Sequence, residues 1–258
     1  MTPQRRRAME RWAPLVLLAA FLVLWQAVVT ALSVPDYLFP SPWQVAQQFA
    51  EFKGPLLQAA WSTFWVTMVG FALSIVFGVL LGFLIGSSRM AYAAMYPLMV
   101  GFNAIPKAAI VPILVVWFGI GIGPGILTAF MISFFPIMVN IATGLATLEP
   151  ELEDVLRVLG ARRLDVLVKV GLPRSLPYFY GSLKIAITLA FVGTVLAEMT
   201  AGDSGIGNLI QTAGSQQRMP LAFAGLVMIS AMAMAMYELF SYVEKHTTAW
   251  AHRGSQDA

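Results

Sequence analysis

Cysteine is absent from this 258-residue sequence, and only two histidines are present. Without thiols the chain has no disulfides, no thiolate metal sites and no cysteine nucleophile. Charged residues are also scarce, at 11% of the sequence against about 25% in an ordinary soluble domain. Hydrophobic residues instead make up 59%. A chain of this composition has too little polar material to cover a soluble globule.

Long uncharged runs indicate membrane-spanning helices. They extend over residues 12–35, 54–88, 108–148 and 219–237. A helix needs about 20 apolar residues to cross the hydrocarbon core of a bilayer. Glycine- and proline-rich stretches mark breaks between spans. We predict an all-α integral membrane fold in which residues 1–258 form a single transmembrane domain. Its six predicted spans are 13–32, 63–86, 92–118, 126–147, 175–196 and 221–242.

The first run follows four arginines, so a cleaved signal peptide is the alternative interpretation. Its length of about 20 apolar residues exceeds the roughly 7–15 of a signal peptide, and Val34-Pro35-Asp36 is a poor cleavage context. We expect it to remain as an anchor. Two segments between spans are not expected to cross the membrane: an interfacial loop with a short amphipathic stretch at 43–52, and a glycine-rich polar segment at 201–217.

The basic residues predict the orientation of the chain. With the amino terminus in the cytoplasm, twelve of the 16 lysines and arginines lie inside, and only Lys53 and Arg218 lie outside. The other two, Lys107 and Lys184, fall within spans. The positive-inside rule therefore predicts that both termini and residues 148–174 are cytoplasmic. This distribution also argues against nucleic-acid binding, since the basic residues sit at the ends of apolar runs.

Residues 148–174 carry too many charges to lie in hydrocarbon, and their pattern predicts two short helices. Pro150 and the acidic residues after it suit a helix start, and Gly160 suits a left-handed end. An apolar stripe lies between them, at Leu152, Val155, Leu156 and Leu159. We predict a second helix over 162–170 that stops at Gly171-Leu172-Pro173. From the residues alone, a solvated connector packed on neighbouring spans is an equal alternative.

The spacing within this loop resembles the EAA motif of ABC-importer permeases, E-A-A-x3-G-x9-I-x-L-P. The matching residues are Asp154, Val155, Leu156, Gly160, Val170, Leu172 and Pro173. Aspartate replaces the usual glutamate, and two larger side chains replace the alanines. Further stretches resemble the nitrate, sulfonate and taurine branch of that family: Phe39-Pro40-Ser41-Pro42, Ile105-Pro106-Lys107, Trp117-Phe118-Gly119-Ile120-Gly121 and Ala197-Glu198-Met199.

The resemblance implies a type I ABC-importer permease fold, in which the loop containing Leu159 and Gly160 couples the permease to ATPase subunits. It also implies a bacterial inner (plasma) membrane location, with two ATPase copies, a second permease copy and an extracytoplasmic solute-binding protein as partners. The sequence agrees with this division, because a phosphate-binding loop needs a Gly-Lys pair and none of the five lysines follows a glycine. We therefore predict a transporter subunit in contact with membrane lipid, and no enzyme activity of its own.

Two other classes of protein are alternatives to a permease subunit. Gly202-Asp203-Ser204-Gly205 is similar to the nucleophile motif of intramembrane serine proteases. The only histidines, His246 and His252, lie beyond the last span and on the opposite side of the membrane from Ser204. A channel or ATPase-independent carrier is the second alternative, but it does not explain the paired loop helices.

Polar residues inside the spans are the candidates for a translocation pathway. Lys107 and Lys184 predict that the solute is a small anion, and the family resemblance implies one of the nitrate, sulfonate or taurine kind. A neutral or cationic heterocycle is the alternative solute, and pairing with an acid on a neighbouring span is the alternative role of each lysine. Glu198 and Asn103 are further pathway candidates, with a packing role as the alternative for Glu198. Fourteen methionines are interpreted as packing or lipid-facing residues, so we predict no metal and no cofactor.

Overall fold

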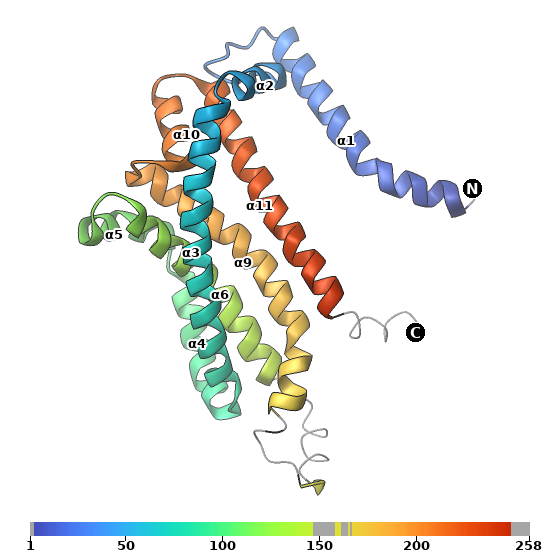
Figure 1. Ribbon diagram of the computed structural model, residues 1–258, viewed down its shortest axis with the longest axis vertical. Helices are drawn as coiled ribbons and strands as arrows, with labels where there is room; N and C mark the ends of the chain where they lie inside the picture. Colours follow the sequence, from blue (N-terminus) through green and yellow to red (C-terminus); the bar gives the residue numbers. More distant parts are fainter. Residues whose placement is uncertain (1–2, 147–157, 161–164, 166, 249–258) are drawn as a thin grey trace.

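The computed structural model describes residues 3–146, 158–160, 165 and 167–248. All regular elements in these residues are helical, and Figure 1 shows them as an elongated bundle with one helix set apart. In chain order they are α1 (Pro3–Ala31), α2 (Pro42–Glu51), α3 (Lys53–Gly86), α4 (Arg89–Ala104), η1 (Lys107–Ile110), α5 (Val111–Phe118), α6 (Ile122–Ala146), η2 (Leu167–Gly171), α9 (Leu172–Ala201), α10 (Gly205–Ser215) and α11 (Met219–Thr247).

Five of these helices are long and apolar enough to cross a membrane: α1 over Trp12–Ala31, α3, α6, α9 over Ser175–Ala201, and α11. A sixth apolar unit consists of α4 and the segment Lys107–Phe118, which together are bent by 68°. Each predicted span overlaps one of these helices or this bent pair, and α3 begins ten residues before the predicted second span.

The third predicted span is broken, where a single helix interrupted by prolines was expected. α4 ends at Ala104, and Ile105 adopts an extended conformation with φ −64° and ψ 127°. A residue before proline disfavours the helical conformation, so Pro106 accounts for this extended residue. The chain resumes as the η1 turn and α5, and Figure 1 shows α5 pointing away from the axis of α4.

The core of the bundle lies where α6 packs against α3 on one side and α9 on the other. Three glycines of α3, at positions 78, 82 and 86, face α6 so closely that a Cβ atom on any of them would come within 2.9 Å of a residue of α6. Small residues of this kind allow helix backbones to approach each other in a membrane. Ile137, Ile141 and Leu145 of α6 fill the space beside them.

Buried hydroxyl groups join the same three helices. The Oγ atoms of Ser74 on α3 and Ser133 on α6 are 2.6 Å apart. About two turns closer to the amino terminus of α3, Thr67 donates to the Oγ1 of Thr194 on α9 over 2.8 Å. Side chains of this kind hydrogen-bond across membrane helices and fix their register.

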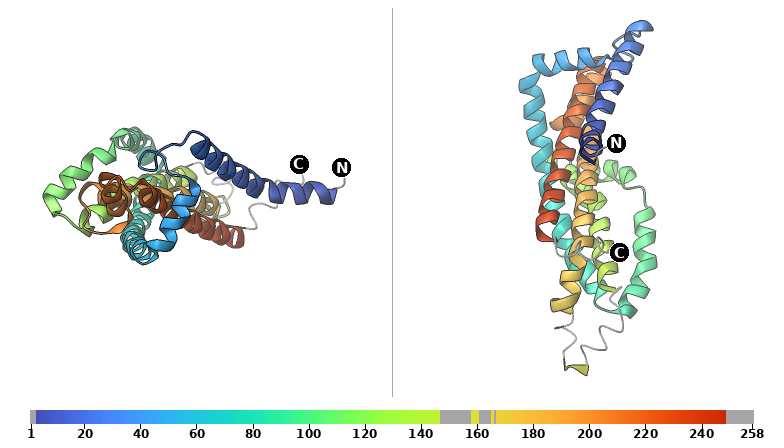
Figure 2. Two further views of the ribbon diagram at one scale, coloured as in Figure 1. Left: turned by 90° about the horizontal axis from the view of Figure 1, so that it is seen from above. Right: turned by 90° about the vertical axis from the view of Figure 1, so that its right-hand side faces the viewer.

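α1 stands apart from the rest of the bundle in Figure 1 and in the left view of Figure 2. Its apolar stretch is only 6% buried, and the helix contacts α2. The predicted amphipathic stretch at 43–52 forms α2, which starts with a capping box between Ser41 and Gln44. The glycine-rich segment at 201–217 contains α10, which lies with α2 at one end of the bundle (Figure 1).

The second loop helix does not stop where we predicted. Gly171 has helical angles, φ −61° and ψ −52°, so the π-helical turn η2 leads directly into α9. Pro173 lies in the first turn of α9 and has no backbone N–H to donate to the carbonyl groups of η2. The chain therefore enters its fifth span as a continuous helix from the end of the predicted loop.

Candidate functional site

Glu198, predicted as a pathway or packing residue, is a buried carboxylate of α9 that hydrogen-bonds to α3 and α10. It lies near the end of α9 with 7% of its surface exposed. Thr63 of α3 donates a hydrogen bond to it, with the Thr63 Oγ1 2.9 Å from each carboxylate oxygen. The backbone N–H of Gly207, in α10, donates to its Oε2 over 2.9 Å.

The start of α10 is built around this carboxylate. The first backbone N–H groups of a helix have no partner within the helix, and a negative group near them is favourable. Here Thr63 accepts from the N–H of Ile206 over 2.8 Å, while Glu198 takes the N–H of Gly207. Gly205 has φ +94°, and a Cβ atom at that position would collide with the Glu198 carboxylate. A glycine is therefore required at this turn.

A cavity of about 790 Å³ lies beside this contact, between α3 and α10. Ser62 and Ser204 meet at its wall, with their Oγ atoms 3.2 Å apart. Trp61 and Trp65 of α3 also line it. Sequence reasoning missed Thr63 and this cavity, although Thr63 and Thr67 are hydroxyl residues four positions apart in an apolar run.

Two predicted pathway residues come together at the break in the third span. The ammonium of Lys107 donates to the side-chain oxygen of Asn103 over 2.9 Å and to its backbone oxygen over 3.0 Å. It also lies 5.0 Å from the centre of the Phe135 ring. The Asn103 carbonyl lies in the last turn of α4, where backbone oxygens lack helical partners, so the cation stabilises that end.

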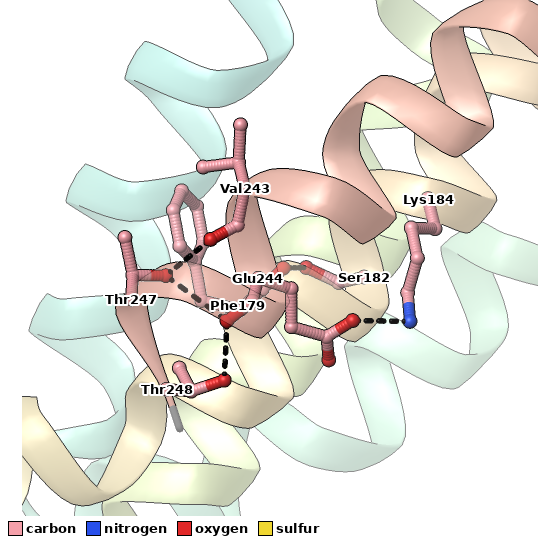
Figure 3. A network of polar contacts seen from close by, with 7 residues as sticks. All are labelled: Phe179, Ser182, Lys184, Val243, Glu244, Thr247 and Thr248. Carbon is pink, nitrogen blue, oxygen red and sulfur yellow. Dashed lines mark hydrogen bonds and ion pairs between the residues drawn. The ribbon is translucent and has the colours of Figure 1, made fainter. Parts of the chain in front are cut away.

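Lys184 forms an ion pair with an acid on a neighbouring helix. Its Nζ is 2.6 Å from Oε2 of Glu244 on α11, and the two side chains are 19% and 15% exposed. Figure 3 shows this pair beside the end of α11, where Thr247 and Thr248 hydrogen-bond to the backbone oxygen of Glu244. The structure thus contains the pairing weighed as the alternative for Lys184, with Glu244 as a partner that the sequence did not identify.

The coupling-loop residues are only partly described. Asp154, Val155 and Leu156 lie outside the described residues. Gly160 has φ +87°, as expected for a left-handed turn, and Leu159 before it is 76% exposed. Of the remaining motif residues, Val170 belongs to η2, and Leu172 and Pro173 start α9. Within the part of the chain that the structure describes, no three His, Asp or Glu side chains are placed to hold a metal ion.

Comparison with known proteins confirms the resemblance seen in the sequence. A family model for the binding-protein-dependent transport system inner membrane component matches residues 74–248. A probable ABC transporter permease protein of Haemophilus influenzae is 33% identical over 224 residues, covering 87% of this chain and 91% of that protein. The riboflavin transport system permease protein of Chloroflexus aurantiacus is 32% identical over 253 residues, covering 95% and 94%.

A solved structure of the MetNI methionine ABC transporter in an inward-facing conformation has the same fold, with a TM-score of 0.66 at 17% identity. The match covers 76% of this chain and 98% of that one. ATP hydrolysis resides on a separate chain in such transporters, so the protein is a non-enzymatic membrane subunit. The chain belongs to the family of binding-protein-dependent transport system inner membrane components, the permease subunits of ABC importers.

Proposed function

We propose that the chain conducts a small organic solute into the cell, driven by ATPase subunits that dock on residues 148–174. The observation that carries this proposal is the left-handed turn at Gly160, which leads to η2 and the first residue of α9. Val158 and Leu159, next to the turn, are 88% and 76% exposed and offer an apolar surface to a partner. α9 extends from this end of the bundle to Glu198 at the other end. A movement of the loop would therefore be transmitted along α9 to the surroundings of Glu198.

The proposed orientation places residues 148–174 and both termini in the cytoplasm. Arg89, Lys169 and Lys245 belong to the end of the bundle that holds Gly160, whereas Lys53 and Arg218 belong to the end that holds α2 and α10. This charge difference supports the orientation by the positive-inside rule. An extracytoplasmic binding protein would then deliver the solute at the α2 and α10 end.

A second permease copy is part of the proposal. The apolar face of α1 is covered by little of its own chain, and exposed apolar side chains also line α5, including Val116 and Trp117 at 83% and 71% exposure. We assign a portion of these surfaces to the second copy and the rest to lipid. The pathway would form where the two copies meet.

The solute itself is proposed only as a class. Relatives are named for transport of riboflavin, formylaminopyrimidine, taurine and aliphatic sulfonates. The prediction of an anionic, taurine-like solute depended on free positive charge at Lys107 and Lys184. Because Lys184 is paired with Glu244, the argument from charge now depends on Lys107 alone.

The test is uptake of these four kinds of solute by cells with and without the chain. ATP-driven import predicts uptake that stops when cellular ATP is depleted and continues when the proton gradient alone is collapsed. Uptake that survives ATP depletion would favour the channel or carrier alternative and would refute the proposal.

A further inference from the structure

The cavity between α3 and α10 is lined by two facing rows of uncharged polar side chains. One row follows α10, from Ser204 just before the helix through Asn208 and Thr212 to Gln216 just after it. The other row, on α3, consists of Gln58 and Ser62. Residues four apart lie on the same face of a helix, so each row follows one face. An amphipathic helix normally turns its polar face to water or to another protein surface. Here the polar face of α10 borders a cavity.

Two tryptophans add an aromatic surface to this cavity, whose lining also includes the aliphatic residues Val66, Ile122 and Ile126. The rings of Trp61 and Trp65 are nearly parallel, with centroids 6.3 Å apart and planes inclined by 12°. Both residues line the cavity, and they are 67% and 61% exposed. Tryptophan is common at membrane interfaces, where single rings anchor helices. A parallel pair beside two rows of hydrogen-bonding groups is instead suited to a flat ring, which can stack on an indole while its edge is hydrogen-bonded.

The charges around the cavity balance. Asp203 and Arg218 both line it and lie beyond opposite ends of α10, an 11-residue helix about 16 Å long. The Arg218 guanidinium is stacked on Phe52 at 4.6 Å, and Asp203 accepts a hydrogen bond from Ser204 over 3.2 Å. Neither Lys107 nor Lys184 is among the lining residues. The cavity therefore has no excess of positive charge to bind a small anion.

We propose that this cavity is a solute-binding site of the permease, and that its ligand is a flat-ringed molecule with several hydrogen-bonding groups. Its volume of about 790 Å³ falls in the range of about 300–1,000 Å³ that holds ligands of this size, and greatly exceeds the need of a nitrate-sized ion. The proposal rests on the proposed function, because it names the solute class of that transporter.

The site can be tested with the full-length chain in lipid nanodiscs and lumiflavin, a flat, uncharged heterocycle whose fluorescence is quenched by stacking on tryptophan. We expect saturable quenching by the wild type. Trp61→Ala should weaken binding by about tenfold or more through the lost stacking surface, whereas Trp61→Phe should keep most of it. Trp43→Ala is the matched control, since Trp43 is a tryptophan of α2 with the same exposure of 67% that lies outside the cavity, and it should bind as the wild type does.

A second measurement uses the absence of cysteine from the chain. In a Gln216→Cys variant, lumiflavin should slow the reaction of the single thiol with a maleimide, and excess taurine or nitrate should not. Three results would overturn the site: no saturable quenching by the wild type, equal losses in Trp61→Ala and Trp43→Ala, or displacement of lumiflavin by taurine or nitrate.

Neither assay contains an ATPase, so the site and the proposed function can fail separately. A chain that drives ATP-dependent uptake but does not bind lumiflavin would refute the site alone. A chain that binds lumiflavin but supports only ATP-independent uptake would refute the proposed function alone.

Discussion

Thr63 of α3 and Glu198 of α9 form a hydrogen-bonded pair that fixes the start of a third helix, α10. The Thr63 Oγ1 lies 2.9 Å from each Glu198 carboxylate oxygen and accepts the backbone N–H of Ile206. One hydroxyl thus serves two neighbouring helices at once. The polar row of α10 is held against α3 by this contact, so we expect Thr63 and Glu198 to determine the geometry of the cavity beside them.

Replacing Thr63 by valine tests this contact. Valine keeps the side-chain shape but leaves the Ile206 N–H and the Glu198 carboxylate short of a partner. We expect a loss of about 1–3 kcal/mol in stability, the usual cost of an unsatisfied buried polar group. Thermal unfolding of the purified chain measures it, with Thr63→Ser as the control that keeps the hydroxyl. Equal stability of the two variants would contradict the role given to Thr63.

Gly82 allows the close approach of α3 and α6. A Cβ atom there would lie 2.8 Å from the backbone oxygen of Met138, so Gly82→Leu should separate the helices and lower the yield of folded protein. Gly101→Leu is a matched change on α4, because no atom lies within 4 Å of a Cβ at that position. Size-exclusion chromatography of both variants gives the comparison, and similar profiles would refute the packing argument.

The ion pair of Lys184 and Glu244 predicts a specific pattern in a double-mutant cycle. Lys184→Met or Glu244→Met alone leaves one charge unpaired in a partly buried site, so each should destabilise the chain more than the double variant does. We expect a coupling energy of about 0.5–3 kcal/mol from thermal unfolding.

Uptake by the same double variant separates structure from transport. If Lys184 only pairs with Glu244, the double variant should retain uptake once it is folded. Uptake that is lost in a stable double variant would return Lys184 to the translocation pathway.

Gly160 should be required for coupling rather than for insertion. Its φ of +87° costs a residue with a Cβ atom about 1–2 kcal/mol, so Gly160→Ala should distort the turn before η2 and α9. Gly181→Ala is the matched control, since Gly181 lies within α9 and has room for a Cβ. We expect reduced uptake and normal membrane levels for Gly160→Ala only. Full uptake by Gly160→Ala would remove the turn from the coupling mechanism.

Single cysteines test the orientation, because the native chain has none. Ser215→Cys should react in intact cells with a maleimide that cannot cross the membrane. Leu159→Cys, 76% exposed at the other end, should react only after the cells are opened. The reverse pattern would show that the orientation is inverted.

The predicted spans overlap the long apolar helices of the structure, because crossing hydrocarbon imposes one simple requirement on composition. The 68° bend of the third span was only partly predictable. Prolines 97, 106 and 112 all interrupt that span, and the sequence does not say which one breaks the helix. Pro97 lies within α4, whereas Pro106 follows the extended residue Ile105.

The long-range contacts of the site could not be read from the chain. Glu244 lies 60 residues from Lys184, and Thr63 lies 135 residues from Glu198. The helix α10 was not predicted within the glycine-rich segment at 201–217, since glycine usually interrupts a helix. Gly205 and Gly207 are instead needed because side chains there would collide with Glu198. By contrast, Asn103 and Lys107, four residues apart, were both identified and are in contact.

Purification of the tagged chain from its native membrane in a mild detergent tests the central claim most directly. An importer permease should carry an ATP-binding-cassette ATPase with it, and the complex should hydrolyse ATP in a vanadate-sensitive manner. Asp154→Arg, which reverses the charge at the predicted start of the first loop helix, should reduce that capture while leaving the chain in the membrane. A folded wild-type chain that captures no ATPase would contradict the account.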